Sequence, residues 1–96
     1  MRIGQGLDVH RFSEDPARPL MLGLVHVSEG PGLIGHSDAD AATHALCDAI
    51  LGALGRGDLG RQFPDSDPTF HNVASRQLLL ACLDFATHDG FRVASA

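Results

Sequence analysis

Three residues from two separate segments offer side-chain atoms of the kind that bind a divalent metal. Asp8 and His10 lie two positions apart, and His44 follows in a segment with helical periodicity. Successive side chains of a strand point to opposite faces, so Asp8 and His10 would project from one face. Two ligands on a strand and one on a packed helix can converge on a tetrahedral zinc whose fourth position is open to a substrate oxygen. The alternative for Asp8 and His10 is a hydrogen-bonded pair on a strand face.

A second polar segment, residues 35–40, precedes the helical pattern that contains His44. Free backbone N–H groups and the positive end of a helix dipole favour phosphate at such a position. His36 could donate to an anionic oxygen, and Ser37 could either bind phosphate or cap the helix. Simple capping by Ser37 or Asp38 is the alternative.

A third segment combines hydrogen-bond acceptors with residues that break regular structure. Its members are Asp58, Leu59, Gly60, Phe63, Pro64, Asp65, Ser66 and Asp67. Acceptors suit the hydroxyls of a sugar-like substrate, and glycine permits close approach. The alternative is a solvated surface loop without a ligand.

The remaining histidines and the cysteines are interpreted without a chemical role. His26, His71 and His88 stand in surface or loop contexts. The spacing of Cys47 and Cys82 fits neither a zinc knuckle nor a disulfide framework. Buried free thiols are typical of a reducing compartment.

The net charge and the amino-terminal residues argue against several classes of protein. The 96 residues carry a formal net charge of −5 with histidines neutral, which argues against a nucleic-acid or anionic-membrane surface. Residues 1–4 contain no apolar signal-peptide core, and no segment approaches the roughly 18 apolar residues of a membrane span. We therefore expect a cytoplasmic protein.

Two strand regions are expected to position the first half of the site. Residues 2–10 alternate, with Ile3, Leu7 and Val9 on the face opposite the two metal-ligand candidates. Gly4 and Gly6 indicate close backbone approach. Residues 20–27 form the second expected strand, with a bend or bulge at Gly23.

A helix over residues 40–54 is expected to carry His44. Its predicted core face consists of Ala41, Ala45, Ala49 and Ile50. A polar stripe of Asp40, His44 and Asp48 would face the site. Residues 55–67 are too rich in glycine, proline and aspartate for regular structure.

A second helix is expected over residues 73–88, capped by Asn72 and followed by Gly90. Phe91 and Val93 would begin another strand. The pattern predicts an α+β fold with helices packed on one face of a small β-sheet, truncated before the C-terminal strands. We treat residues 1–96 as one partial domain.

These segments, in this order, resemble the 2-C-methyl-D-erythritol 2,4-cyclodiphosphate synthase family. The resemblance lies in residues 1–10, in residues 36–48, in residues 57–68 and in the helix from Ser75 to Gly90. The separated motifs keep their mutual spacing, and together they cover essentially the whole chain.

The resemblance implies an enzyme of non-mevalonate isoprenoid biosynthesis, a phosphorus–oxygen lyase. Its family converts 4-diphosphocytidyl-2-C-methyl-D-erythritol 2-phosphate to the 2,4-cyclodiphosphate and releases CMP. The resemblance also implies that Asp8, His10 and His44 bind Zn²⁺, and that a second divalent ion, Mg²⁺ or Mn²⁺, binds the substrate diphosphate. Family members are homotrimers with active sites between subunits.

The resemblance also assigns roles to individual residues. His36 is the catalytic residue, as a transition-state stabiliser beside the phosphates. The implied substrate-binding residues are Asp8, Val9, His10, His36, Ser37, Asp58, Leu59, Gly60, Phe63, Pro64, Asp65, Ser66 and Asp67.

The chain departs from the family pattern at two positions and in its extent. Gln5 stands where the family usually has His, and Arg56 occupies a usually apolar position. The cytidine pocket, a carboxylate for the second metal and a catalytic threonine have no match, so we expect little or no turnover from this chain alone.

The alternative function is a non-catalytic zinc-binding fragment or an oligomerisation module. The order of the motifs disfavours an unrelated metal-dependent phosphoesterase.

Overall fold

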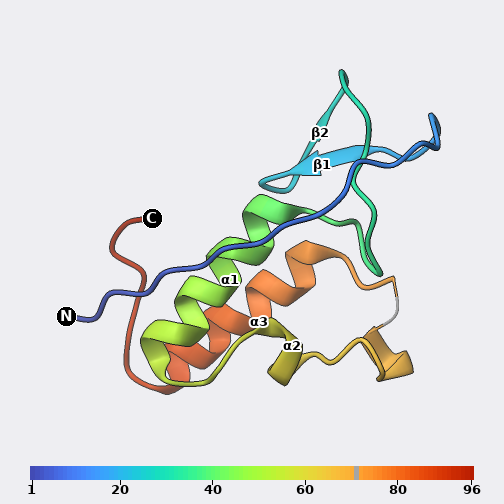
Figure 1. Cartoon of the computed structure of the whole chain (residues 1–96). Helices are drawn as coiled ribbons and strands as arrows, with labels where there is room; N and C mark the ends of the chain where they lie inside the picture. Colours follow the sequence, from blue (N-terminus) through green and yellow to red (C-terminus); the bar gives the residue numbers. More distant parts are fainter. Residues whose placement is uncertain (71) are drawn as a thin grey trace.

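The computed structural model describes residues 1–70 and 72–96 (Figure 1). Its elements are β1 (Leu20–Leu22), β2 (Val25–Val27), α1 (Ala41–Leu54), α2 (Leu59–Gln62), a 3₁₀ turn (Pro68–Phe70) and α3 (Ser75–His88). β1 and β2 form a two-stranded antiparallel sheet at the start of α1. The predicted α+β class is confirmed. Among the described residues, no helix is long and apolar enough to cross a membrane.

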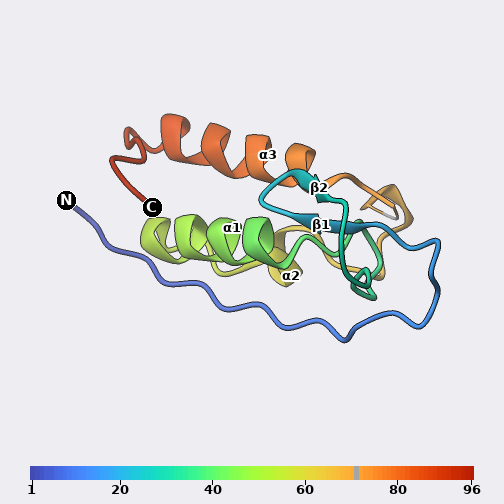
Figure 2. The same cartoon turned by 90° about the horizontal axis from the view of Figure 1, so that it is seen from above.

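The core lies between α1 and α3, which pack side by side (Figures 1 and 2). Its buried members are Cys47, Ile50, Leu51, Leu78, Cys82 and Ala86. Both cysteines are buried free thiols, as predicted. The hydrogen bond with Cys82, and then burial, raise the pKa of the Cys47 thiol, which fits a core residue better than a nucleophile.

The predicted core face of α1 was wrong in phase. Of the four expected residues only Ile50 is buried, and the face toward α3 includes Thr43, Cys47 and Leu51 instead. The backbone of Ala45 and Ala49 instead lies against the N-terminal segment, at Gly6 and Gly4. That segment runs along α1 on the side away from α3 (Figure 2).

Residues 2–10 are extended, as predicted, but they form no strand. The nearest ladder contact is a single antiparallel bridge between Phe12 and Leu33. A strand needs a neighbouring backbone with which to exchange hydrogen bonds, and in the described structure this segment lies on a helix whose backbone groups are already paired. Residues 91–96, where another strand was expected, also form none.

Close backbone contact at Gly4 and Gly6 is confirmed. A Cβ at Gly4 would lie 1.8 Å from the carbonyl oxygen of Ala49, and one at Gly6 would lie 1.7 Å from that of Ala45. Two extended residues advance about 6.7 Å, close to the about 6 Å of four helical residues. The even-numbered side of the segment therefore follows α1 toward its first turn, and the next even residue is Asp8.

The strand expected over residues 20–27 is a hairpin. Its turn residues, Gly23 and Leu24, have φ values of 62° and 66°, a conformation that is uncommon for leucine. The carboxylate of Asp40 accepts hydrogen bonds from both turn N–H groups, at 2.8 and 2.6 Å, and from Thr43 N at 2.9 Å. Asp40, not Ser37 or Asp38, is therefore the N-cap of α1 and also anchors the hairpin.

Two boundaries after α1 also differ from the expectation. The 55–67 region contains the short helix α2, whose N-cap Asp58 accepts from Arg61 N at 2.8 Å. α3 begins at Ser75 instead of Val73, and Asn72 does not cap it. Asp38, from the loop before α1, accepts from Ser75 N at 3.0 Å instead. The contact between Asp38 and Ser75 joins residues 37 positions apart, so local pattern could not reveal it.

Candidate metal centre

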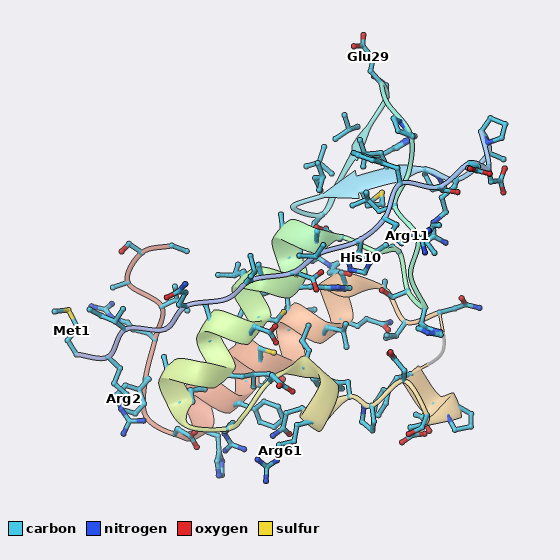
Figure 3. The ribbon with its side chains drawn as sticks, viewed as in Figure 1. Met1, Arg2, His10, Arg11, Glu29 and Arg61 are labelled. Carbon is cyan, nitrogen blue, oxygen red and sulfur yellow. The ribbon has the colours of Figure 1, made fainter. Side chains whose placement is uncertain are left out.

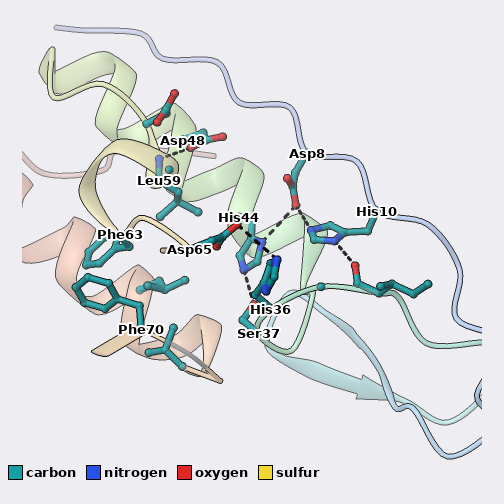
Figure 4. Close-up of a pocket in the computed structure, with 16 residues that line it drawn as sticks. Asp8, His10, His36, Ser37, His44, Asp48, Leu59, Phe63, Asp65 and Phe70 are labelled. Atoms are coloured by element: carbon teal, nitrogen blue, oxygen red, sulfur yellow. Dashed lines mark hydrogen bonds and ion pairs between the residues drawn. The ribbon is translucent and has the colours of Figure 1, made fainter. Parts of the chain in front are cut away.

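Asp8, His10 and His44 meet at one point beside the first turns of α1 (Figure 4). Asp8 Oδ2 lies 2.7 Å from His10 Nε2 and 3.3 Å from His44 Nδ1. One donor atom from each residue lies within 4.8 Å of the others. The predicted convergence is present, although the segment that carries Asp8 and His10 is not a strand.

Alternation along the extended segment explains why both N-terminal side chains point inward. Ile3, Leu7 and Val9, on the odd-numbered side, are 88%, 79% and 81% exposed. Asp8 and His10, on the even side, retain only 24% and 17% of their side-chain exposure. In Figure 3, His10 lies where the segment crosses the start of α1, far from Met1 and Arg2.

Two atoms of this group have the chemistry and the surroundings of metal ligands. Asp8 Oδ2 and His10 Nε2 are buried and make no hydrogen bond, although they lie 2.7 Å apart. The contact has ion-pair distance without hydrogen-bond alignment, and buried polar atoms without a partner are uncommon because their desolvation is not compensated. One carboxylate oxygen and two imidazole nitrogens are a donor set that Zn²⁺ accepts. The residues therefore fit a divalent metal.

The other ring nitrogen of each histidine is also held. His10 Nδ1 lies 2.7 Å from the carbonyl oxygen of Ile34. A carbonyl only accepts, so His10 Nδ1 carries a proton, and in the neutral ring Nε2 presents a lone pair. His44 Nε2 lies 2.8 Å from Ser75 Oγ. Such outer contacts orient metal-binding histidines.

A pocket of about 550 Å³ opens beside the three residues (Figure 4). Predicted site residues that line it are Asp8, His10, His36, Ser37, His44, Asp58, Leu59, Gly60, Phe63 and Asp65. Val9, Pro64, Ser66 and Asp67 are not among its lining residues. Val9 points outward, and Asp67 accepts from Thr69 N at 2.9 Å, so it caps the 3₁₀ turn.

The pocket also includes residues that the sequence patterns missed. They are Ile34, Phe70, Val73 and Leu78, whereas Gly35, which also lines it, belongs to the predicted segment 35–40. Phe70 packs edge-on against Phe63, with ring centroids 5.2 Å apart. Phe70 lies just beyond the expected loop 55–67, and it could have been noticed as an apolar wall only after Phe63 had been placed.

The predicted polar stripe on α1, Asp40, His44 and Asp48, does not face the pocket as a whole. His44 and Asp48 line the pocket, as expected. Asp48 accepts from Leu59 N at 2.8 Å and thereby holds α2 against α1. Asp40 faces the hairpin and is fully buried, so its predicted place in the stripe was wrong.

The loop before α1 is fixed by its own side chains and by Arg18. Ser37 Oγ accepts from Ala39 N at 3.3 Å, and Ala39 has a φ of 54°. Arg18 donates to the carbonyl oxygens of Leu33 and Ser37, at 2.8 and 2.7 Å. Residues 41–43, at the start of α1, do not line the pocket, so a phosphate there would meet His36 and Ser37 and not the free N–H groups of the helix start.

His36 lies at the open side of the pocket. Its Nε2 is 3.9 Å from Asp65 Oδ2, and the two side chains are 69% and 74% exposed. His26 and His88 are exposed, as expected. His71 lies outside the described residues.

Comparison with known proteins identifies the relatives of this chain. The YgbB family matches residues 1–96. Proteins named 2-C-methyl-D-erythritol 2,4-cyclodiphosphate synthase from Syntrophobacter fumaroxidans and Shewanella halifaxensis are 50% and 52% identical over 95 residues, 99% of this chain. The chain spans 58% of the length of each. A solved structure of such a synthase, described as its CDP-bound form, matches with a TM-score of 0.84 and 43% identity, over 93% of this chain and 58% of its own.

Proposed function

The chain belongs to the YgbB family, and on this premise we propose that it carries the metal and phosphate part of a cyclodiphosphate synthase site. The proposed reaction converts 4-diphosphocytidyl-2-C-methyl-D-erythritol 2-phosphate to 2-C-methyl-D-erythritol 2,4-cyclodiphosphate and CMP, in non-mevalonate isoprenoid biosynthesis. The names of the relatives support the product, and a CDP-bound relative supports a cytidine nucleotide as ligand. The proposed enzyme is a phosphorus–oxygen lyase.

Asp8, His10 and His44 are the proposed ligands of a divalent metal, with Zn²⁺ favoured by their nitrogen and oxygen donors. When bound, such an ion polarises a phosphate oxygen. A second divalent ion, Mg²⁺ or Mn²⁺, is proposed on the substrate diphosphate. The observation that carries the proposal is the pair of buried, unpartnered atoms at the centre, Asp8 Oδ2 and His10 Nε2.

The chain's own residues would then hold the substrate in a folded conformation. His36, at the pocket mouth, can donate a hydrogen bond to a phosphate oxygen. Ser37 Oγ accepts from Ala39 N, which leaves its hydroxyl proton free for an anion. Asp58 and Asp65 can accept from substrate hydroxyls, and Phe63 with Phe70 forms the apolar wall.

Positioning is the main contribution expected of these residues. The reaction joins two phosphate groups of one molecule, so no covalent enzyme intermediate is required. Correct orientation of reacting groups accounts for roughly 7–11 kcal/mol of a barrier. We also propose a homotrimer in a reducing cytoplasm, where the buried thiols of Cys47 and Cys82 stay reduced.

Zinc binding by the 96-residue chain tests the proposal directly. The metal-stripped chain should bind Zn²⁺ in a calorimetric titration with a stoichiometry of about one. His10→Ala and His44→Ala should each abolish measurable binding, whereas His26→Ala, an exposed histidine outside the site, should leave it unchanged. Wild-type chain that binds no zinc, or His44→Ala that binds as well as wild type, would refute the metal site.

An assay of CMP release separates catalysis from metal binding alone. The 96 residues span 58% of their relatives, so we propose that they turn over the substrate far more slowly than a full-length relative. Slow release that disappears with His36→Ala would support a catalytic site in this chain. Zinc binding without release under any condition would favour the non-catalytic alternative, and release at the rate of a full-length relative would contradict the proposed slow turnover.

A further inference from the structure

The ring nitrogen of His44 that faces away from the metal centre contacts a buried hydroxyl. His44 Nε2 lies 2.8 Å from Ser75 Oγ, and Ser75 is fully buried at the first position of α3. Ser75 Oγ donates in turn to Asp38 Oδ1, and Ser75 N donates to Asp38 Oδ2 at 3.0 Å. A chain of hydrogen bonds thus links α1, α3 and the loop before α1.

The direction of each hydrogen bond in this chain follows from the chemistry of its last member. A carboxylate only accepts hydrogen bonds, and a serine hydroxyl has one proton. That proton points to Asp38, so Ser75 Oγ can only accept from His44 Nε2. His44 Nε2 therefore carries a proton, and in the neutral ring the lone pair lies on Nδ1, which is 3.3 Å from Asp8 Oδ2.

We propose that Asp38 and Ser75 are positioning residues that fix the tautomer and ring orientation of His44 and so present Nδ1 to the metal. The inference rests on the proposed metal site. The two histidines use opposite nitrogens for this purpose. His10 is fixed through Nδ1 by the Ile34 carbonyl, whereas His44, inside a helix, is fixed through Nε2 by a side chain of a second helix.

Ser37 is the competing hydroxyl, but it is the weaker candidate. Its Oγ lies 3.4 Å from His44 Nε2, against 2.8 Å for Ser75. Hydrogen bonds to nitrogen weaken beyond about 3.2 Å. Ser37 also lines the pocket, where its hydroxyl proton is free for substrate, so the task of orienting His44 falls to Ser75.

The tautomer of His44 can be read directly in the metal-free chain. Long-range ¹H–¹⁵N correlation spectra of the ¹⁵N-histidine-labelled chain should show His44 with a protonated Nε2, assigned by its absence in His44→Gln. In Ser75→Ala the signal should shift toward a mixture of tautomers, as expected for exposed His26. A wild-type His44 protonated on Nδ1 would overturn the proposal, and no variant is needed for this outcome.

Metal affinity provides the second readout. Loss of an outer hydrogen bond to a metal-binding histidine weakens binding by about 10–100-fold, and we expect this for Co²⁺ and Zn²⁺ with Ser75→Ala. Ser75→Thr keeps the hydroxyl and should restore most of the affinity. Asp38→Asn keeps one acceptor oxygen and should fall between the two. Ser28→Ala and Asp84→Asn, both exposed, are the matched controls.

The two proposals fail in different ways. If the wild-type chain binds no metal, the metal site is refuted, while the His44 tautomer still tests the hydrogen-bond chain. If wild type binds metal and Ser75→Ala binds it within about two-fold, far from the expected 10–100-fold loss, the positioning role is wrong. If Ser75→Ala does not fold, Ser75→Thr, Asp38→Asn and the wild-type tautomer decide the matter.

Discussion

Gly6 lies so close to α1 that a Cβ at this position would stand 1.7 Å from the carbonyl oxygen of Ala45. The contact holds the N-terminal segment against the helix two residues before Asp8. Asp8 therefore reaches His44 only because Gly4 and Gly6, which face the helix ahead of it, have no side chain that would push the segment away.

Gly6→Ala should destabilise the chain and weaken metal binding. The added methyl group would collide with backbone atoms, which cannot move as a flexible side chain can, and overpacking typically costs about 1–3 kcal/mol. Urea denaturation and zinc titration would measure both effects. Gly52→Ala is the control, because a Cβ at Gly52 meets nothing within 4 Å. Since alanine is favoured over glycine in a helix by about 0.5–1 kcal/mol, this control should be stabilising. Equal effects of the two substitutions would contradict the packing argument.

Asp40→Asn should weaken the attachment of the hairpin to α1. Burial disfavours the charged carboxylate, but hydrogen bonds from Thr43, Leu24 and Gly23 together outweigh it and hold the pKa of Asp40 below its usual value. Asparagine keeps one acceptor oxygen and remains a good N-cap, but its amide NH₂ cannot accept the hydrogen bonds that the second carboxylate oxygen takes from Leu24 N and Thr43 Oγ1. Leaving such donors unpaired costs about 1–3 kcal/mol, and the free energy of unfolding at pH 7 should fall by about this amount. Asp84→Asn, exposed on α3, should have no measurable effect.

The same carboxylate predicts a pH dependence. A folded-state pKa below the unfolded value contributes stability above about pH 3.9, the ordinary aspartate pKa, and this stability is lost as pH falls through the lower folded-state value. Wild type should therefore lose more stability than Asp40→Asn on acidification through this window. Parallel pH profiles of the two proteins, measured by urea denaturation, would show that Asp40 is not the group responsible.

Arg56 joins the ends of α1 and α3. It donates to both carboxylate oxygens of Asp89 at 2.8 Å, and its guanidinium lies 4.5 Å from the Phe85 ring centroid. The hydrogen bonds from Arg56 lower the pKa of Asp89. Arg56→Gln should lower the melting temperature at neutral pH, and the difference from wild type should shrink in high salt and in acid, where Asp89 is protonated. Arg61→Gln is the control. A difference that persists unchanged at low pH would exclude the ion pair as its cause.

Metal should stabilise the folded chain if the centre forms only in the folded state. Zinc at a free concentration one hundred times its Kd should add about 2.7 kcal/mol to the free energy of unfolding. A chelator should remove this increment from wild type and should not change His10→Ala. The melting temperature with and without zinc is the measurement, and His88→Ala, outside the site, should behave as wild type does. A zinc-induced rise in His10→Ala equal to that of wild type would place the metal elsewhere.

The sequence by itself determined the proposed ligand set and the approximate positions of the hairpin and the two long helices. The alternation of residues 2–10 put Asp8 and His10 on one side, and the helical period located His44 within α1. Both patterns depend on neighbours in the chain, so they hold whether or not the segment is paired as a strand. Gly4 and Gly6 also correctly predicted that the backbone of this segment makes a close contact.

Only the tertiary structure decided what those elements meet. The core face of α1 was decided by two neighbours, α3 on one side and the N-terminal segment on the other. Alanine packs well against either neighbour, so the alanines of α1 could not tell the two faces apart. Asp40 caps α1 because the hairpin turn brings two N–H groups to the Asp40 carboxylate. Ser75 reaches His44 across a separation of 31 residues, because α3 packs beside α1 and burial leaves the Ser75 hydroxyl few other partners. Contacts of this kind depend on three-dimensional proximity, which no local periodicity encodes.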